Sequence, residues 1–258
     1  MIKCCPFDKA LIDRFRNETL VIRYDAFSEI IAVANAVNEN NRLHCIMINY
    51  PKKLDSLTIY EEYADIPIAL YTPGIGEISD FIKKIKMFRK LNIRVFLPES
   101  DSETFSGLRI LSSLGIACGI VFDRKNPDWE SVNDLMHYAV YGMVSRGQIE
   151  PFGYLLLNYE RGKYIDYGAV YFNDPERYFH ISSFGILSLF HERLLSREDF
   201  FLKPEGCAYC QGWRICLGKF PDSSNQKYGC QKLFVDVLEA AEYYYKKRTS
   251  DSNQLWQL

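Results

Sequence analysis

The sequence lacks a long apolar run, an excess of one charge and an apolar leader. No stretch reaches the roughly 18 consecutive apolar residues that a membrane span requires, so we expect no membrane helix. The 31 basic and 33 acidic side chains leave a formal net charge of -2, which argues against a general nucleic-acid binder. The N-terminal stretch MIKCCPFDKALIDRF carries charges where a secretory signal has its apolar core, so we expect a cytoplasmic protein.

Histidine is scarce, whereas cysteine is not. The 4 histidines form no H-x-x-x-H pair, so we expect no histidine-based metal site. In a cytoplasmic chain the 8 cysteines are not expected to form a disulfide framework. Half of them lie scattered through the first half of the chain. The others crowd into one short stretch: Cys207, Cys210, Cys216 and Cys230.

Residues 1–160 show a repeated strand-then-helix pattern. Short, nearly continuous apolar runs recur about every 25 residues, which is the spacing of a strand plus a crossover helix. The predicted strands are Thr19–Arg23, His44–Asn49, Pro67–Tyr71, Ile93–Leu97, Ile116–Phe122 and Tyr154–Tyr159. The clearest amphipathic helices between them are Asp25–Asn38, Glu77–Leu91 and Asp128–Val144. This repetition predicts an α/β fold with a parallel sheet, open or partly closed as a barrel.

The pattern changes over residues 161–258. Two runs, Tyr164–Phe172 and Arg177–Ser182, flank an Asn-Asp-Pro-Glu stretch that is typical of a hairpin turn. A helix is predicted over Ser183–Ser196, before the cysteine-rich stretch, and an amphipathic helix starting near Cys230 closes the chain. We therefore expect a barrel-like domain over 1–160 and a small hairpin-plus-cysteine-cluster domain over 161–258.

The clustered cysteines have metal-ligand spacing. Cys207 and Cys210 form a C-x2-C pair, which lets two sulfurs meet one metal centre across a tight turn. Cys216 and Cys230 complete a four-thiolate set. Four thiolates suit either a structural Zn²⁺ or an iron–sulfur cubane, and spacing alone does not separate the two. Four unliganded thiols are the alternative, but free cysteines rarely cluster at ligand spacing on a glycine-containing loop.

This stretch resembles the SPASM or twitch auxiliary-cluster region of radical SAM peptide maturases. Cys207, Cys210 and Cys216 match the C-x2-C-x5-C of that family, and Cys230 matches its final cysteine. The resemblance implies that these four residues ligate one [4Fe–4S] cluster, with Zn²⁺ as the alternative. It is specific over about residues 165–240 and only architectural before that.

Other parts of the family pattern are missing. Phe220 and His180 stand about where the family has cysteines of its first auxiliary cluster, so that site looks lost. The resemblance implies a partial (β/α)6 barrel over 1–160, but the catalytic C-x3-C-x2-C is absent after Thr19–Arg23, where this chain reads YDAFSE. MINYPKK replaces the glycine-rich SAM-binding segment. Without three thiolates to hold the cluster that cleaves SAM, we expect a pseudo-enzyme that binds no SAM.

The resemblance implies an accessory role in ribosomal-peptide modification. The protein would bind a precursor peptide or a radical SAM maturase, with the metal site acting structurally or as an electron relay. The predicted hairpin over Tyr164–Ser182 is the candidate docking edge, since extended peptides add to exposed strands. Two alternatives stay open: a diverged enzyme with a small-molecule site in the barrel mouth, and a structural zinc protein.

A set of polar residues follows the predicted strands at their carboxyl ends. Sites on β/α barrels lie at that end of the sheet, so these side chains are candidates for a polar mouth. The alternative is that they serve as helix caps and loop residues. They are Asp25, Asn49, Glu99, Asp123 and Asn158.

The missing cysteine motif makes a testable prediction about chemistry. Reduced, metal-loaded protein incubated with SAM should yield no 5′-deoxyadenosine, because no site-specific cluster is available to deliver the electron. Chromatography of the quenched mixture measures the product against a blank without protein. Product above that blank would refute the pseudo-enzyme assignment.

Overall fold

A computed structural model describes residues 1–58, 61–122, 127–144, 146–174, 176–181, 210–217, 220 and 229–255, and in the last helix it describes side chains as far as Thr249. Within these residues the core is one parallel sheet of eight strands in the order β7-β6-β5-β4-β3-β2-β1-β8. The strands are β1 Ile2–Pro6, β2 Thr19–Arg23, β3 Arg42–Asn49, β4 Ile68–Tyr71, β5 Ile93–Pro98, β6 Ala117–Val121, β7 Ile149–Glu150 and β8 Tyr178–His180. The predicted α/β class with a parallel sheet is therefore confirmed.

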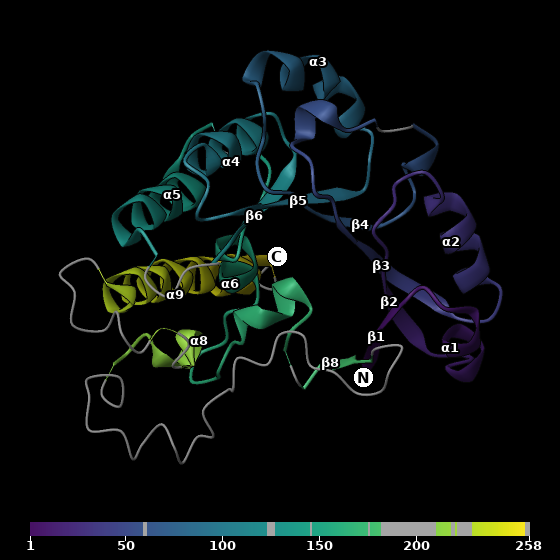
Figure 1. Ribbon diagram of the computed structural model, residues 1–258. Coiled ribbons are helices and arrows are strands. Elements are labelled where there is room, and N and C mark those ends of the chain that lie inside the picture. Colours follow the sequence, from purple (N-terminus) through teal and green to yellow (C-terminus); the bar gives the residue numbers. More distant parts are fainter. Residues whose placement is uncertain are drawn as a thin grey trace.

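The crossover helices lie along one side of the sheet (Figure 1). From β1 to β7, strands that are consecutive along the chain are also neighbours in the sheet, so right-handed connections place the helices between them on the same face, whereas β8 returns to pair with β1. These helices are α1 Lys9–Arg14, α2 Ile30–Asn38, α3 Ile78–Phe88, α4 Thr104–Ser113 and α5 Trp129–Tyr141, with short 3-10 turns η1 Leu54–Ser56 and η2 Glu61–Tyr63 before β4.

The remaining helices gather on the other side of the sheet (Figure 1). They are α6 Phe152–Leu157, the 3-10 helix η3 Tyr167–Tyr171, α8 Trp213–Cys216 and α9 Cys230–Leu255. The long helix α9 packs against α5, α6 and α8. No helix in the described part of the chain combines the length and the apolar character that a bilayer crossing demands.

The five predicted strands that correspond to β2–β6 are confirmed. Each of them is covered on both faces of the sheet. In β2, for example, Leu20, Val21 and Ile22 are all fully buried. Burial on both faces produces continuous apolar runs instead of an alternating pattern. The predicted helix over Asp128–Val144 is confirmed as α5, and Asp128 caps it by accepting from the Ser131 backbone N–H at 3.2 Å.

The sixth predicted strand, Tyr154–Tyr159, is wrong. The run forms α6 and the turn after it, with Phe152 and Leu155 buried and Leu157 exposed. Burial at a spacing of three residues is helical, and a short continuous apolar run does not distinguish a helix from a strand. The sheet gains β1, β7 and β8 instead.

The predicted hairpin is also wrong. Its first arm is the 3-10 helix η3, whose first turn is capped by Asp166 accepting from the Gly168 backbone N–H at 2.7 Å. Its second arm is a strand, β8, which pairs in parallel with β1, with Ile2 opposite Tyr178. Val170 at the centre of the expected docking edge is 3% exposed. Residues of η3 are buried without alternation, because they pack against the sheet, and that packing overrides their strand propensity.

The inner face of the sheet, opposite α4, is filled by the chain itself. Leu97 meets α4 at Gly107, so its neighbour Phe96 points to the inner face. There Phe96 stacks on Tyr71 with ring centroids 4.7 Å apart and meets Tyr171 of η3 at 5.7 Å. The Tyr171 hydroxyl donates to the Ile120 carbonyl at 2.6 Å.

Gly119 makes this filling possible. A Cβ built at Gly119 would lie 2.7 Å from Cε1 of Phe96 and 3.0 Å from Cβ of Glu150. Only a residue without a side chain fits between these two groups. The phenyl ring of Phe96 therefore lies across the bare backbone of β6.

This contact predicts a coupled effect on stability. Gly119→Ala should lower the free energy of unfolding by about 1–3 kcal/mol, because the ring of Phe96 blocks the new methyl group. In a Phe96→Leu background the same change should cost less than half as much, since the blocking carbons are gone. Urea unfolding of the four proteins of this double-mutant cycle measures the coupling, and strictly additive effects would contradict the contact.

Candidate metal centre

Cys210 lies in a tight turn that leads into α8. The Trp213 backbone N–H donates to the Cys210 carbonyl at 3.1 Å, which closes the turn. Burial raises the pKa of the Cys210 thiol, while hydrogen bonds from the backbone N–H groups of Gly212 and Trp213 favour the thiolate and lower it. Backbone donors directed at a sulfur stabilise the charged form that a metal requires.

Cys216 and Cys230 lie on two helices that pack together. Cys216 is the last residue of α8 and Cys230 is the first residue of α9. Both are buried, and the Cys230 thiol faces the Phe220 carbonyl at 3.5 Å. Burial is the main cause that raises the pKa of Cys210, and a negative charge on Cys216 would raise it further.

Gly212 brings the Cys210 turn against α9. A Cβ at Gly212 would lie 2.7 Å from Cβ of Phe234, and the Cys210 sulfur would lie 3.5 Å from it. Phe234 is one helical turn beyond Cys230 and is 1% exposed. The missing side chain at Gly212 thus lets the turn and the first turn of α9 approach each other.

The structure addresses three of the four predicted ligands. Cys207 lies outside the described residues, as does the predicted helix over Ser183–Ser196. Among the residues that are described, no group of three histidine, cysteine, aspartate or glutamate side chains is placed closely enough to hold a metal ion. What the structure brings together is Cys210 with Cys216, and the helix that ends in Cys216 with the helix that begins at Cys230.

The other cysteines have a different character. Burial raises the pKa of Cys4 and of Cys45 to about 12, and that of Cys5 to about 11. It also raises the pKa of Cys118, which is fully buried in β6. Thiols with such high pKa values remain protonated at neutral pH, so these four residues pack as small apolar side chains.

Aromatic rings join the cysteine region to the inner face of the sheet. Phe220 meets Phe122 at 5.3 Å and Trp129 at 4.9 Å. Phe234 stacks on Tyr167 at 5.9 Å, and Tyr167 meets Tyr171 at 6.1 Å. The last two contacts form a continuous series from Phe234 of α9 through Tyr167 to Tyr171, one of the residues that fill the inner face of the sheet. Aromatic pairs of this kind each add about 0.5–1.5 kcal/mol beyond the area they bury.

An ion pair between a buried carboxylate and a partly exposed arginine lies beside the aromatic filling. Glu150 of β7 is 2% exposed and lies 3.5 Å from the Arg94 guanidinium of β5. Its other oxygen accepts from the Tyr154 backbone N–H at 2.8 Å. Burial raises the pKa of Glu150, although Arg94 and the Tyr154 N–H act in the opposite direction. The pair joins β5 and β7, the two strands that flank β6, which contains Gly119.

The predicted polar mouth is only partly supported. Glu99 follows β5 and is 3% exposed, but its carboxylate accepts from the backbone N–H of Asp128 at 2.8 Å, which ties it to the residue that caps α5. Asn158 follows a helix instead of a strand, so its placement in the mouth was wrong. Asp123 lies outside the described residues, and Asp25 and Asn49 are exposed at the ends of their strands.

Sequence reasoning missed the residues that fill the inner face and those that position the cysteine turn. Gly119 interrupts an otherwise apolar strand, and a glycine inside a strand often marks a close approach of another group. Gly212 lies within the x5 segment of the cysteine pattern, and that pattern carries no sign of its contact with α9. No sequence signal places Tyr171 against Phe96, because that contact joins residues distant in the chain.

No protein-family model, no curated protein and no solved structure matches this chain, so any assignment of function has to be argued from its own residues.

The turn at Gly212 predicts how metal content depends on a residue that is not a ligand. Gly212→Ala keeps all four cysteines and a permitted backbone, with φ of -70, but it pushes the Cys210 turn away from Phe234. If the four cysteines hold a metal, its content after anaerobic reconstitution should fall in Gly212→Ala, as it should in Cys210→Ala. Elemental analysis measures the content. Gly162→Ala is the control for general instability, because an alanine there strains the backbone at φ of +80 without meeting any neighbouring atom. Full metal content in Gly212→Ala would contradict the role of the turn.

Proposed function

We propose that this protein is a non-catalytic accessory of ribosomal-peptide modification, which binds a precursor peptide or a radical SAM maturase. The filling of the inner face by Tyr71, Phe96 and Tyr171 carries this proposal. A β/α enzyme needs space for cofactor and substrate at the carboxyl ends of its strands, where Tyr71 ends β4 and Phe96 lies two residues before the end of β5. Here the chain's own rings take up that space, and the sequence lacks the cysteines that would hold a SAM-cleaving cluster.

The proposal includes a finer description of the fold. We assign residues 1–160 to a degenerate partial (β/α)6 barrel and residues 161–258 to a metal-binding domain similar to SPASM or twitch domains. The sequential strand order supports the barrel, because singly wound β/α units curve in one direction. The packing of α8 on α9, with a cysteine at the end of one and the start of the other, supports the metal-binding domain.

The proposed metal site consists of Cys207, Cys210, Cys216 and Cys230. Two features of the described residues fit a thiolate-bound cation. Cys210 has backbone N–H donors at its sulfur, and a negative charge at Cys216 opposes a second one at Cys210. A cation would relieve that repulsion. A [4Fe–4S] cluster is the proposed occupant and Zn²⁺ the alternative, since four thiolates accept either.

The metal decides between two versions of the proposal. Anaerobic reconstitution with iron and sulfide, followed by elemental analysis and an absorption spectrum, should give four iron atoms per chain by the stoichiometry of a cubane. Stoichiometric zinc without iron after the same treatment would replace the cluster with a structural zinc site and would leave the binding role in place.

The binding role is tested with the peptides and maturases encoded beside the gene. Calorimetric titration of each candidate into the metal-loaded protein should detect a saturable complex. Mass spectrometry of the peptide, recovered after incubation with this protein alone, should show no change in mass. A change in mass that depends on the loaded protein would overturn the non-catalytic assignment, and the absence of any complex would overturn the accessory role.

A further inference from the structure

The short helix α8 depends on its neighbours for its orientation. It spans only Trp213–Cys216, and a single helical turn has little stability apart from tertiary contacts. Its close approach to α9 lies at its start, where Gly212 meets Phe234. That contact alone would leave α8 free to pivot, so the position of Cys216 at its far end depends on a second attachment.

The segment 159–165, which follows α6, holds α8 at Arg214. The Ile165 backbone N–H donates to the Arg214 carbonyl at 3.0 Å. The Arg214 guanidinium lies over the Tyr159 ring, 5.1 Å from its centroid, and donates to the Glu160 carbonyl at 3.4 Å. A guanidinium over an aromatic face is attracted to the ring electrons. Both the backbone and the side chain of Arg214 are therefore attached to this segment.

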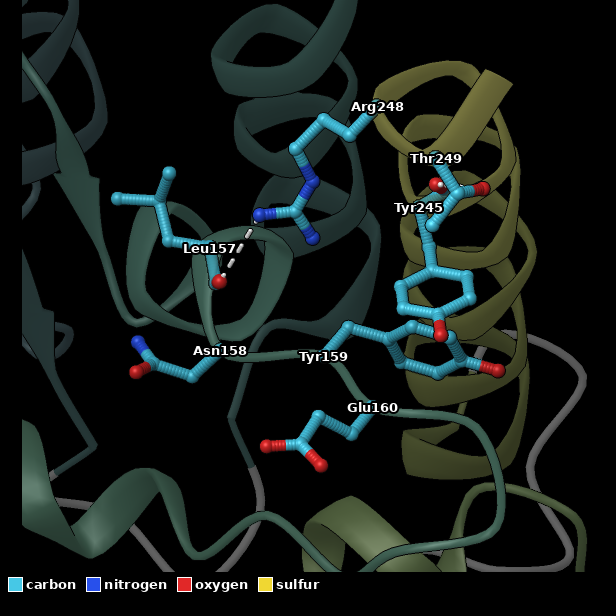
Figure 2. Close-up of a pocket in the computed structure, with 7 residues that line it drawn as sticks. All are labelled: Leu157, Asn158, Tyr159, Glu160, Tyr245, Arg248 and Thr249. Atoms are coloured by element: carbon cyan, nitrogen blue, oxygen red, sulfur yellow. Dashed lines mark hydrogen bonds between the residues drawn. The ribbon is translucent and has the colours of Figure 1, made fainter. Parts of the chain in front are cut away.

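Tyr159 connects the same segment to α9. Its ring meets the ring of Tyr245 edge to face, with centroids 5.8 Å apart (Figure 2). Its hydroxyl donates to the Glu242 carboxylate at 2.5 Å. Both partners lie on α9, about three to four turns beyond Cys230. Tyr159 is 5% exposed, so little water competes for these contacts, and one side chain links α8 to α9.

The hydrogen bond between Tyr159 and Glu242 is charge-assisted at neutral pH. Burial and this hydrogen bond raise the pKa of Tyr159, although Arg214 acts in the opposite direction, so the hydroxyl keeps its proton. The same hydrogen bond, together with Lys246 and Arg161, lowers the pKa of Glu242, so its carboxylate stays ionised. A hydrogen bond to an ionised acceptor is roughly twice as strong as one between neutral groups.

We propose that Tyr159 and Arg214 form a bracket that sets the orientation of α8 on α9, and thereby the spacing of the cysteine sulfurs. Arg214 lies between Cys210 and Cys216 in the chain, so the bracket holds the segment that carries both. A thiolate site tolerates little displacement, because its metal–sulfur bonds have a fixed length and geometry. The inference rests on the proposed function in one respect: it names the residues that position the proposed metal ligands.

The first test needs no metal. Hydrogen exchange of the metal-free protein, followed by mass spectrometry, should be faster in the peptides that cover α8 for Tyr159→Phe and for Arg214→Gln than for the wild type. Tyr159→Phe keeps the ring under the guanidinium and removes only the hydrogen bond to α9. Arg109→Gln is the matched control, because it removes an arginine that lies 5.6 Å from the ring centroid of Tyr138, between α4 and α5. The control should leave exchange of α8 unchanged.

The second test uses Zn²⁺ as the probe, because four thiolates accept it as well as an iron–sulfur cluster. Competition with a chromogenic chelator should show roughly tenfold weaker binding of Zn²⁺ in each single variant, the order of loss that follows removal of a group that orients metal ligands. The double variant Tyr159→Phe/Arg214→Gln should lose little more than either single variant, since both changes break the same bracket. Arg214→Lys should recover most of the affinity, because a lysine cation also lies favourably over an aromatic ring.

The outcomes separate this inference from the proposed function. If the wild type binds Zn²⁺ and both single variants bind it equally well, the bracket fails and the proposed metal site stands. If the wild type takes up neither zinc nor iron while the variants speed the exchange of α8, the metal site fails and the hold of the bracket on α8 stands. Exchange of α8 at the wild-type rate in both variants would overturn the bracket, as would additive losses in the double variant or a loss in Arg214→Lys as large as in Arg214→Gln.

Discussion

The contact of the Phe96 ring with the bare backbone of Gly119 is the constraint on which the inner face depends. It lets a large ring lie flat against β6, where any Cβ would meet it at 2.7 Å. Tyr171 then packs on that ring and reaches the Ile120 carbonyl of the same strand. The position of η3 follows from this arrangement.

Burial explains which strands were predictable. The strands β2 to β6 are covered on both faces and read as continuous apolar runs, so their positions followed from composition. The edge strands offer too little sequence for that reasoning, since β7 has 2 residues and β8 has 3. The segment at Phe152–Leu157 failed for another reason, because it is apolar, short and equally compatible with a helix.

The candidate site divides in the same way between local and distant information. Cysteine spacing is local, and it indicated a turn that the structure has at Cys210, where backbone N–H groups face the sulfur. The contact of Gly212 with Phe234 joins residues that are far apart in the sequence, and single-sequence patterns carry no record of such pairs. The same limit applies to the contact of the Tyr159 ring with the Tyr245 ring, which come from different parts of the chain.

The proposed metal site and the filled sheet are physically one unit, and this bears on why such a site would persist without catalysis. Phe234 follows Cys230 on α9 and stacks on Tyr167, which in turn packs against Tyr171 on the inner face. A metal that orders the start of α9 would therefore also restrain η3, because metal binding contributes its free energy to folding. Further along the same helix, Arg248 donates to the Leu157 and Leu156 carbonyls at the end of α6. One α-helix thus connects the clustered cysteines, the filled inner face and the end of α6, so a ligand that orders its first turn would also restrain the packing of these elements.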